Sequence, residues 1–489
     1  MKKLVIRICS TFFIPSLIII LAFGAPARKP AAKKKINLAL RDKLAAIASS
    51  KCLVKANVGI KVVSLDDGEV IFEKNAYEPL IPASNMKVLT SAAAFHYLKP
   101  EYTFKTVLYH DGQISGKTLK GNLCVKGYGA PDLVGENVWI MMKEFCESGI
   151  RRIEEDIIGD DTYFDSIPKP VSWPDNVDDN PYGAPVSALS CNYSSVRITI
   201  KPGQAGGKPI VTLFPFSDFF RIINNAKTNN GNNNLFIRRV FEEGANRILL
   251  SGSISYRSGE FSEYRSVDNP TLYTLSCIRE TLRELGVEVT GTIKSGPVPS
   301  KARQILVFKS KPLAQIVYDM NKNSNNFIAE MLLKTLGAEV IGQPGTTEKG
   351  CDVLRMFLRN SGIDTSRIAI LDGSGLSRRN LLTADCLTHL LKSMDEKFGE
   401  GYEFVSSLPI GGADGTLRRQ LYNNGVARRV RGKTGYISGV KSLSGYVENL
   451  SGERFAFAFI VNSSKCGPYD VQEQMDKFCE AISSSSSSN

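Results

Sequence analysis

Residues 82–90 of the 489-residue chain read PASNMKVLT and place a serine and a lysine three positions apart, at Ser84 and Lys87. They lead into an apolar run that ends at Leu98, and this run predicts a helix beginning near Ser84. One interpretation is structural, because serine is a common helix N-cap and a lysine one turn later is usually solvated. The other is chemical, because side chains at this spacing share a helix face and can act as a nucleophile and its base.

The spacing alone does not decide between them, because it recurs at Ser166–Lys169 and at Ser438–Lys441. The first recurrence contains a proline where a helix would be needed, and the second lies between predicted strands. Only Ser84 stands at the start of a strongly apolar helix, where the helix dipole favours negative charge developing on the serine oxygen.

Strand patterns occur near both ends of the chain. Residues 58–74 predict two strands around an Asp-Gly turn, and residues 428–437, 442–449 and 454–462 predict three successive strands. Residues 471–482 predict a closing amphipathic helix. We therefore expect the two ends to form halves of one antiparallel sheet flanked by helices.

The long middle of the chain has a different pattern. Residues 102–297 contain many short alternating stretches, which predict an inserted strand-rich region with a nested subdomain at about 195–270. The remaining domain is then split into residues 37–101 and 298–482. Residues 483–489 are serine-rich, and we expect them to be a disordered tail.

Most of the positive charge is local. The formal charge is +12, but residues 1–35 contribute +8 of it and contain no acid. The rest of the chain has no basic stripe with interleaved aromatic residues, which argues against nucleic acid as a partner.

Residues 1–27 have the basic, apolar and small-residue segments typical of a secretory signal peptide, with an uncleaved membrane anchor as the alternative. Residues 28–36 then form a basic linker, and we expect export to the periplasm or cell envelope with at most peripheral membrane contact.

The cysteines and histidines exclude several kinds of site. Of ten cysteines, Cys9 lies in the expected signal peptide; the other nine are widely spaced and include no CxxC pair, which argues against zinc or a dense disulfide framework. One or two disulfides remain open, and their pairing cannot be predicted. Only three histidines occur, none in an HExxH pattern, so neither a histidine-dependent triad nor a histidine-bound metal is expected. We expect no cofactor.

Two further motifs follow Ser84 and Lys87 in order. Ser324–Asn326 reads SNN between two predicted helices, whereas a similar S-x-N at Ser190–Asn192 lies in the insertion. Lys433–Gly435 reads KTG inside a predicted strand, where the glycine would let a substrate backbone lie against the strand edge. The succession SxxK, SxN and KTG is typical of penicillin-binding proteins and serine β-lactamases.

Longer strings around these motifs, including "GDDTYFD", "NSNNFIAEMLLKTLG", "LDGSGLSRRN" and "LPIGGADGTLRRQL", resemble the D-alanyl-D-alanine carboxypeptidase/endopeptidase family of the penicillin-binding protein 4 or DacB type (peptidase family S13). The similarity runs from about residue 36 to 480. It implies an α+β fold (an α/β sandwich), in which a penicillin-binding-protein/β-lactamase-like domain is interrupted by two extra domains. It also implies peptidoglycan stem peptides ending in D-Ala-D-Ala and crosslinked dimers as substrates, and β-lactams as inhibitors.

The resemblance and the chemistry together assign roles. Ser84 would be the nucleophile and Lys87 its base, with the lysine pKa lowered by burial and a nearby cation, for which Lys433 is the candidate. Ser324 would relay a proton to the leaving amine, and Asn326 would orient Lys87 and the substrate. The N–H groups of Ser84 and Tyr436 would form the oxyanion hole. The predicted substrate-binding residues are Thr434, Gly435, Tyr436, Arg378 and Asp161.

Two of these residues, and three other acids in the quoted strings, have alternative interpretations. Arg378 could be a surface cation, and either Asp161 or its neighbour Asp160 could be the functional carboxylate or merely cap a turn. Asp372 and Asp414 lie in glycine-rich loops and are predicted to be turn residues.

Three functions remain to be compared. The first is a β-lactam-sensitive carboxypeptidase that also cleaves peptide crosslinks. The second is a β-lactamase that uses the same serine, but the chain has no additional carboxylate motif that favours it. The third is a non-catalytic wall-binding or β-lactam-sensing module, against which the three intact motifs argue.

Overall fold

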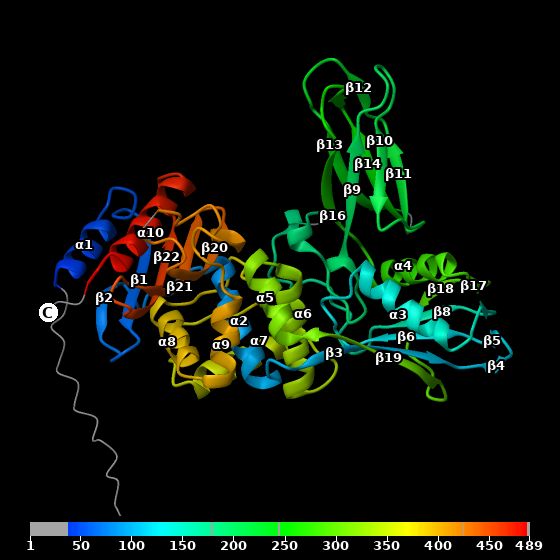
Figure 1. Ribbon diagram of the computed structural model, residues 1–489, viewed down its shortest axis with the longest axis horizontal. Helices are drawn as coiled ribbons and strands as arrows, with labels where there is room; N and C mark the ends of the chain where they lie inside the picture. The colour runs from blue at the N-terminus through cyan, green and yellow to red at the C-terminus, as the bar shows by residue number, and fades with distance from the viewer. Residues whose placement is uncertain (1–37, 178, 243–244, 424, 487–489) are drawn as a thin grey trace, which may run out of the picture. The chain divides into compact units, whose positions relative to one another are not determined.

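The computed structural model describes residues 38–177, 179–242, 245–423 and 425–486 (Figure 1). The expected signal peptide and basic linker lie outside the described residues. Among the helices of the described ranges, none is both long enough and apolar enough to cross a membrane.

One five-stranded antiparallel sheet joins the two ends of the chain, in the order β2-β1-β22-β21-β20. β1 (Asn57–Ser64) pairs along its whole length with β22 (Arg454–Asn462). The other members are β2 (Val70–Lys74), β21 (Val440–Glu448) and β20 (Val430–Ile437). The sheet predicted from the terminal segments is therefore confirmed, and β20, which contains the KTG motif, is an edge strand.

Helices cover both faces of this sheet, and the sequence of β22 shows why. Its phenylalanines 455, 457 and 459 face a core shared with α1 (Leu38–Ala48) and α10 (Pro468–Ser483). The alternating residues Ala456, Ala458 and Ile460 face the opposite core, where α2 (Met86–Leu98) and α8 (Ala384–Asp395) pack. Both faces of the strand are buried, and the resulting helix–sheet–helix layering agrees with the expected α+β class.

The predicted helix at Ser84 begins slightly later than expected. A 3₁₀ turn, Ala83–Asn85, contains Ser84, and α2 runs from Met86 to Leu98 with Asn85 as its N-cap. Ser84 therefore does not cap the helix, and the structural interpretation of this serine is wrong. The two helices expected around the SNN motif are confirmed as α5 (Leu313–Asn323) and α6 (Asn326–Leu336).

The inserted region has its own core and sheets. β3 (Thr103–His110) follows α2 in the chain and pairs with β19 (Arg303–Pro312). Because β19 lies after residue 297, the strands that pair within the insertion extend past its expected boundary. Its largest sheet has the order β18-β8-β6-β3-β19, and α4 (Pro270–Glu284) packs on β8 and β18 and contacts α3 (Gly135–Glu147). The remaining strands of this sheet are β6 (Leu123–Gly127), β8 (Ile157–Asp160) and β18 (Ile293–Ser295).

The described residues between 195 and 266 form separate small sheets, most of whose strands are labelled in Figure 1. Among them, β9 (Ser195–Lys201) pairs with both β10 (Ile210–Phe214) and β16 (Phe261–Ser266). Five further strands are β11 (Phe220–Asn224), β12 (Lys227–Asn229), β13 (Phe236–Glu242), β14 (Ala245–Ser251) and β15 (Ser253–Ser255). This arrangement lies within the expected nested subdomain. The division of the chain into domains remains our prediction.

The C-terminal helix extends into the serine-rich segment. Ser483, assigned from sequence to the disordered tail, is the last residue of α10 and is buried. Its hydroxyl donates a hydrogen bond to the carbonyl of Gly425 at 2.8 Å. The tail can therefore begin no earlier than the residue after it.

A disulfide ties the two ends of the chain together. Cys52 follows α1 and Cys466 follows β22, and the bridge spans 414 residues of sequence. The seven unbridged cysteines of the described ranges are all buried, so they pack as small apolar side chains.

We expect the disulfide to stabilise the catalytic domain mainly by restricting its unfolded state. A Cys52→Ala/Cys466→Ala variant should lose about 2–4 kcal/mol of unfolding free energy, measured as a lower Tm. A reducing agent should lower the Tm of the wild type but not that of the variant. Equal sensitivity of both proteins to the reductant would contradict this origin of the stability.

Candidate active site

A strained turn presents the predicted nucleophile. Ser84 is half-buried, and the preceding Ala83 has φ 47°, in the left-handed region that alanine rarely adopts. Gly375 packs directly on this turn, because a side chain there would collide with the carbonyl of Ala83. The neighbouring Asn85 is buried and bonds to β21, donating to Ser442 Oγ at 2.6 Å and accepting from the Ser444 hydroxyl. The position of Ser84 is thus fixed by the loop and by the sheet.

Lys87 is completely buried and connects three parts of the chain. Its Nζ donates to Ser84 Oγ at 3.1 Å, to Asn326 Oδ1 at 2.6 Å and to the carbonyl of Ser374 at 2.8 Å. Burial lowers the pKa of Lys87 to about 7. A neutral amine is therefore available near neutral pH, and its lone pair can accept the proton of the Ser84 hydroxyl.

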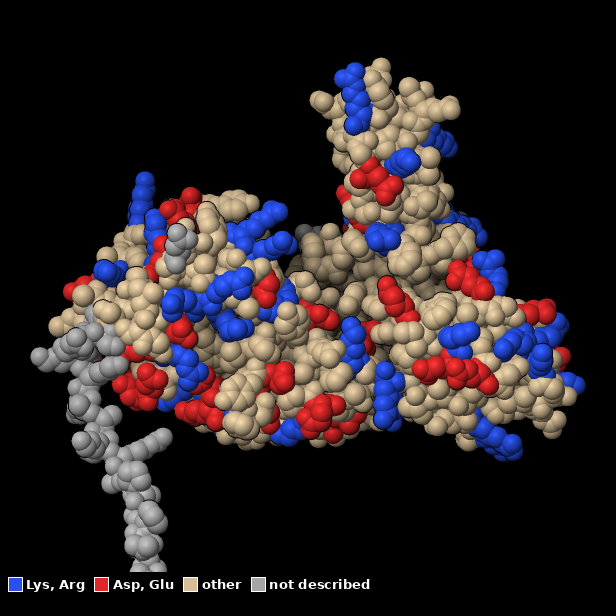
Figure 2. Space-filling model, viewed as in Figure 1, with Lys and Arg blue, Asp and Glu red and all other residues tan. Residues whose placement is uncertain are grey.

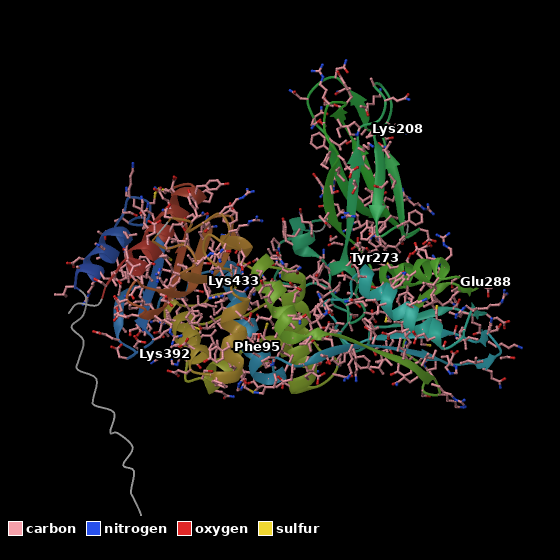
Figure 3. The ribbon with its side chains drawn as sticks, viewed as in Figure 1. Phe95, Lys208, Tyr273, Glu288, Lys392 and Lys433 are labelled. Atoms are coloured by element: carbon pink, nitrogen blue, oxygen red, sulfur yellow. A yellow bond between two sulfur atoms is a disulfide. The ribbon has the colours of Figure 1, made fainter. Side chains whose placement is uncertain are left out.

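Lys433, labelled in Figure 3, forms a second serine–lysine pair beside the first. It is buried on β20, and its Nζ donates to Ser324 Oγ at 2.9 Å and to the carbonyl of Thr434 at 2.8 Å. Burial, followed by the positive charge of Lys87, lowers the pKa of Lys433. Burial is the largest cause of the lowered pKa of Lys87, as predicted, and the mutual effect of the two positive charges appears in the lowered pKa of Lys433.

Asn326 links Lys87 to the inserted region. Its Oδ1 accepts the bond from Lys87, and its Nδ2 donates to the carbonyl of Tyr182 at 2.9 Å. Tyr182 belongs to a short 3₁₀ turn, Pro181–Gly183, and its side chain is exposed. The sequence motifs gave no signal for this contact, which brings a segment of the insertion to the site.

The edge of β20 is open only beside the site. Residues 409–411 pair with the first half of the strand through backbone bonds of 2.9 Å to Val430 and Gly432. Along the rest of β20 to Ile437, no strand of the described chain covers this edge. Because backbone groups alternate in direction along an antiparallel strand, the N–H groups of Thr434 and Tyr436 face the open edge.

Gly435 is required for a different reason from the one predicted. A Cβ atom at Gly435 would collide with Ser442 Oγ and would lie 2.8 Å from the carbonyl oxygen of Pro82 and 3.0 Å from the backbone nitrogen of Ser84. The glycine thus makes room for the protein's own backbone rather than for a substrate. Because Gly435 has no side chain, the backbone N–H of Ser84 can lie close to β20, as the predicted oxyanion hole requires.

Two predicted substrate-binding residues lie along the same strand. Thr434 donates from its hydroxyl to Thr416 Oγ1 at 2.7 Å. Arg378 is exposed and donates from Nη1 to the carbonyl of Ser438 at 2.6 Å, in the turn that follows β20. Arg378 therefore stands at the far end of the open edge.

The structure does not join Asp161 to this cluster. Its Oδ2 accepts bonds from Thr271 Oγ1 at 2.5 Å and from Ser187 Oγ at 3.2 Å, and both partners belong to the insertion. Asp160 is buried and forms an ion pair with Lys126 at 2.9 Å. The hydrogen bonds of both acids hold the insertion together rather than reaching Ser84.

Both acids predicted to be turn residues do accept turn N–H groups. Asp372 accepts from the backbone of Gly375 at 2.8 Å and of Ser377 at 2.6 Å, and Asp414 accepts from Ile410 at 2.8 Å. Trp173 of the insertion also donates from its indole N–H to Asp372 at 2.9 Å. Asp372 therefore supports the loop that contacts Lys87.

Glu330, which sequence reasoning missed, supports the same loop from α6. Its carboxyl group is buried and accepts the N–H of Gly373 at 3.1 Å and of Ser374 at 2.9 Å. Burial, followed by the charge of Asp372, raises the pKa of Glu330 to about 8. Glu330 thus holds the Ser374 carbonyl that accepts from Lys87, and at neutral pH it does so mainly as a neutral acid.

The helix–sheet–helix fold, with two serine–lysine pairs at the edge of β20, places the chain in the class of penicillin-binding proteins and serine β-lactamases. Within that class, the model of the D-Ala-D-Ala carboxypeptidase 3 (S13) family matches residues 40–482, and the chain belongs to this family. It is therefore a hydrolase of the D-Ala-D-Ala carboxypeptidase type.

Known relatives agree along nearly the whole length. The D-alanyl-D-alanine carboxypeptidase of Actinomadura sp. strain R39 is 32% identical over 484 residues, covering 96% of this chain and 89% of the relative. The carboxypeptidase DacB of Haemophilus influenzae is 27% identical over 419 residues, covering 84% and 86% of the two chains. The crystal structure of H. influenzae penicillin-binding protein 4 has the same fold, with a TM-score of 0.79 at 24% identity over 90% of this chain and 98% of that one. A second crystal structure of that protein contains a β-lactam.

The neutral state of Glu330 can be tested by substitution. Glu330→Gln copies the neutral acid, and we expect it to keep the rate of acylation by a fluorescent penicillin within about threefold at pH 7, with an acid limb still near pH 7. Glu330→Ala leaves the two loop N–H groups without an acceptor and should slow acylation by about 5- to 100-fold, because an unsatisfied buried group costs about 1–3 kcal/mol.

The exposed Asp352→Asn provides a control for charge removal. A loss in Glu330→Gln as large as that in Glu330→Ala would show that the negative charge itself is required.

Proposed function

We propose that this chain is an exported serine DD-peptidase that hydrolyses the D-Ala-D-Ala bond of peptidoglycan stem peptides through an acyl-enzyme on Ser84. The observation that carries the proposal is the buried Lys87, whose Nζ lies 3.1 Å from Ser84 Oγ and whose pKa is lowered to about 7. An ordinary solvated lysine, with a pKa near 10.4, could not act as a base at neutral pH.

In the acylation step, the Oγ of Ser84 attacks the carbonyl carbon between the two D-alanines while neutral Lys87 takes the hydroxyl proton. The N–H groups of Ser84 and Tyr436 donate hydrogen bonds to the developing oxyanion. When the C–N bond breaks, Ser324 passes a proton to the leaving amine of D-Ala, and its hydrogen bond with Lys433 allows that proton to be replaced. Water then attacks the ester carbon, the acyl group leaves as a carboxylic acid, and one proton of the water passes to Ser84 Oγ. Lys87 gives up the proton that it took and Lys433 regains the one that it lost, so both lysines return to their starting states.

The open part of the β20 edge would align the substrate. The backbone of Thr434 and Tyr436 can bond to an extended peptide, and Asn326 can orient the penultimate amide while it holds Lys87. The terminal carboxylate would be bound by cations and hydroxyls at this edge, and our candidates are Lys433, Thr434 and Arg378. We keep Asp161 only as a distant candidate, since its hydrogen bonds lie within the insertion.

Cleavage of peptide crosslinks requires no additional chemistry. The acyl group transferred to Ser84 is the same, and only the leaving amine changes from free D-Ala to a residue of a second stem peptide. β-Lactams would acylate Ser84 in the same way, and the β-lactam complex of the H. influenzae protein supports this proposal. The expected signal peptide supports export.

A β-lactamase would use the same serine but would need fast deacylation. Among the described residues, the side-chain partner of the Ser84 hydroxyl is Lys87, and no carboxylate bonds to it. The nearby acids Glu330 and Asp372 are occupied by loop N–H groups. This arrangement favours a long-lived β-lactam adduct.

The purified mature chain should release D-Ala from a pentapeptide and split a crosslinked dimer, and fluorescent penicillin should remain attached to it. Ser84→Ala should abolish all three reactions. Rapid turnover of the penicillin without release of D-Ala would instead indicate a β-lactamase, and wall binding that persists in Ser84→Ala without any hydrolysis would indicate a non-catalytic module.

The base assignment predicts non-additive losses. Lys87→Ala should reduce acylation at least about 10²- to 10⁴-fold, the usual contribution of a general base. The Ser84→Ala/Lys87→Ala double variant should be no worse than Ser84→Ala, because the two side chains act as one unit. Substantial acylation by Lys87→Ala would disprove the role of this lysine.

Arg378 can be tested against its neighbour. If Arg378 binds the substrate carboxylate, Arg378→Ala should raise KM for a D-Ala-D-Ala peptide by about tenfold or more, the size of one charge-assisted hydrogen bond, with kcat little changed. Arg379→Ala removes an equally exposed guanidinium one position away and should leave KM unchanged. Equal effects of the two changes would indicate a general charge effect.

A further inference from the structure

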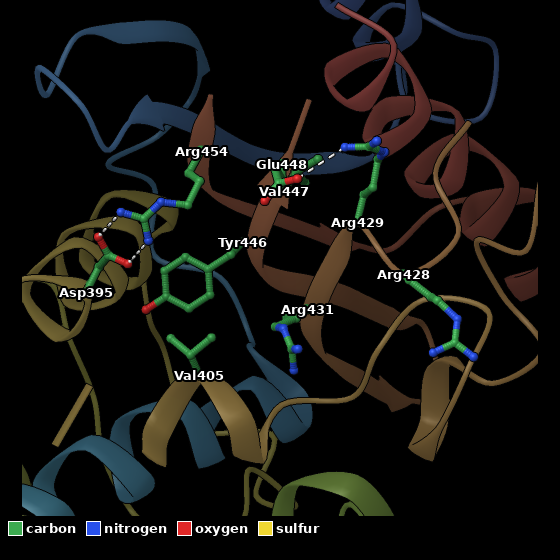
Figure 4. Close-up of a pocket in the computed structure, with 9 residues that line it drawn as sticks. All are labelled: Asp395, Val405, Arg428, Arg429, Arg431, Tyr446, Val447, Glu448 and Arg454. Atoms are coloured by element: carbon green, nitrogen blue, oxygen red, sulfur yellow. Dashed lines mark hydrogen bonds and ion pairs between the residues drawn. The ribbon is translucent and has the colours of Figure 1, made fainter. Parts of the chain in front are cut away.

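A second basic site lies at the beginning of β20, outside the serine–lysine cluster. A cavity of about 150 Å³ opens there between the sheet and α9 (Phe398–Ser407) (Figure 4). On the face shown in Figure 2, lysine and arginine side chains gather over this part of the catalytic domain. The charged residues that line the cavity are Arg428, Arg429, Arg431, Arg454, Asp395 and Glu448.

The charges of the cavity are not balanced. Arg454 forms a two-pronged ion pair with Asp395, at 2.6 and 3.1 Å, and Arg429 pairs with Glu448 at 3.2 Å. The two carboxylates are thereby matched. Arg428 and Arg431 have no carboxylate within ion-pair distance among the described residues, and in Figure 4 no dashed line joins either of them to the two carboxylates drawn there. Two guanidinium groups therefore face one cavity without a counter-charge.

The chain holds these two arginines on well-defined backbone. Arg431 is in β20 and pairs across the edge with Ile410. Arg428 has φ 65°, a left-handed conformation that costs an arginine energy, and its N–H donates to the carbonyl of Gly411 at 2.8 Å. Strained backbone that survives at a charged surface cavity is a common property of binding sites. The buried Tyr446 forms a wall of the cavity. Its hydroxyl donates a hydrogen bond to the carbonyl of Leu391 at 2.8 Å, which fixes the ring.

We propose that this cavity is a binding site for a phosphate group. A carboxylate is satisfied by a single arginine fork, as Arg454 and Asp395 show within the same cavity. A phosphate offers more oxygens and more charge, so it suits a cavity that is lined by two guanidinium groups without a carboxylate of their own. The site requires no residue of the proposed mechanism, and it does not depend on that mechanism.

The cavity lies close to the candidate active site. Arg431 precedes Lys433 by two residues, so the cavity lies roughly 7 Å along the strand from the active lysine. A small phosphate-bearing group, such as glycerol phosphate, could therefore be held on the catalytic domain near the working substrate. The source of the phosphate could be soluble or a lipid headgroup, and the two are distinguished by experiment.

The test uses the mature full-length chain with glycerol 3-phosphate as the soluble probe and phosphatidylglycerol vesicles, against phosphatidylcholine vesicles, as the lipid probe. We expect Arg428→Gln/Arg431→Gln to weaken phosphate binding at least tenfold while D-Ala release from a short peptide stays within twofold. Arg221→Gln/Arg238→Gln removes the same charge from exposed strands of the insertion and should bind like the wild type.

Arg428→Gly separates binding from stability. Glycine adopts the left-handed conformation freely, so this variant should keep or raise the Tm and still lose phosphate affinity. Binding of glycerol 3-phosphate that depends on the two arginines supports a soluble source, and binding confined to phosphatidylglycerol vesicles with the same dependence supports a lipid source. Absence of binding to both probes, or equal losses in the Arg221/Arg238 control, would overturn the proposal.

Discussion

The burial of one amine, that of Lys87, is the constraint on which the rest of the site depends. A charged ammonium group is costly in a region without water. Here the cost is met by hydrogen bonds to Ser84, Asn326 and Ser374, and by a pKa low enough for the group to lose its charge. Each acceptor belongs to a different segment, so the three segments must be assembled before the lysine can be buried. The packing that buries Lys87 is therefore also what lowers its pKa.

The elements around Lys87 act mainly by fixing its acceptors. Asn85 anchors the turn of Ser84 to β21, and Glu330 anchors the loop of Ser374 to α6. The insertion takes part as well, because Tyr182 accepts from Asn326 and Trp173 donates to Asp372. A region that looks like an addition to the catalytic domain in sequence thus supports the innermost hydrogen bonds of the site.

The sequence was sufficient for features that depend on local pattern or on fixed motif spacing. The terminal strands, the helices around Ser324 and the two serine–lysine pairs follow from alternation, apolar periodicity and the order of three short motifs. The features it missed depend on contacts between distant segments. Glu330 is an ordinary position of an apolar helix, and the role of Gly435 appears only when the backbone of Ser84 is seen beside it. Asp161 is the opposite case, a residue that the family resemblance suggested as substrate-binding. Its hydrogen bonds lie within the insertion and do not reach Ser84.

The pairing of β1 with β22 affects the order in which the parts of this enzyme can fold during synthesis. β1 can pair with β22 only after residues 454–462 have been synthesised. The insertion, whose strands pair between residues 103 and 312, can form its sheet long before that moment. Contacts of such long sequence separation form slowly. The order of synthesis therefore makes this sheet, with the candidate active site at its edge strand β20, one of the last parts of the chain to form.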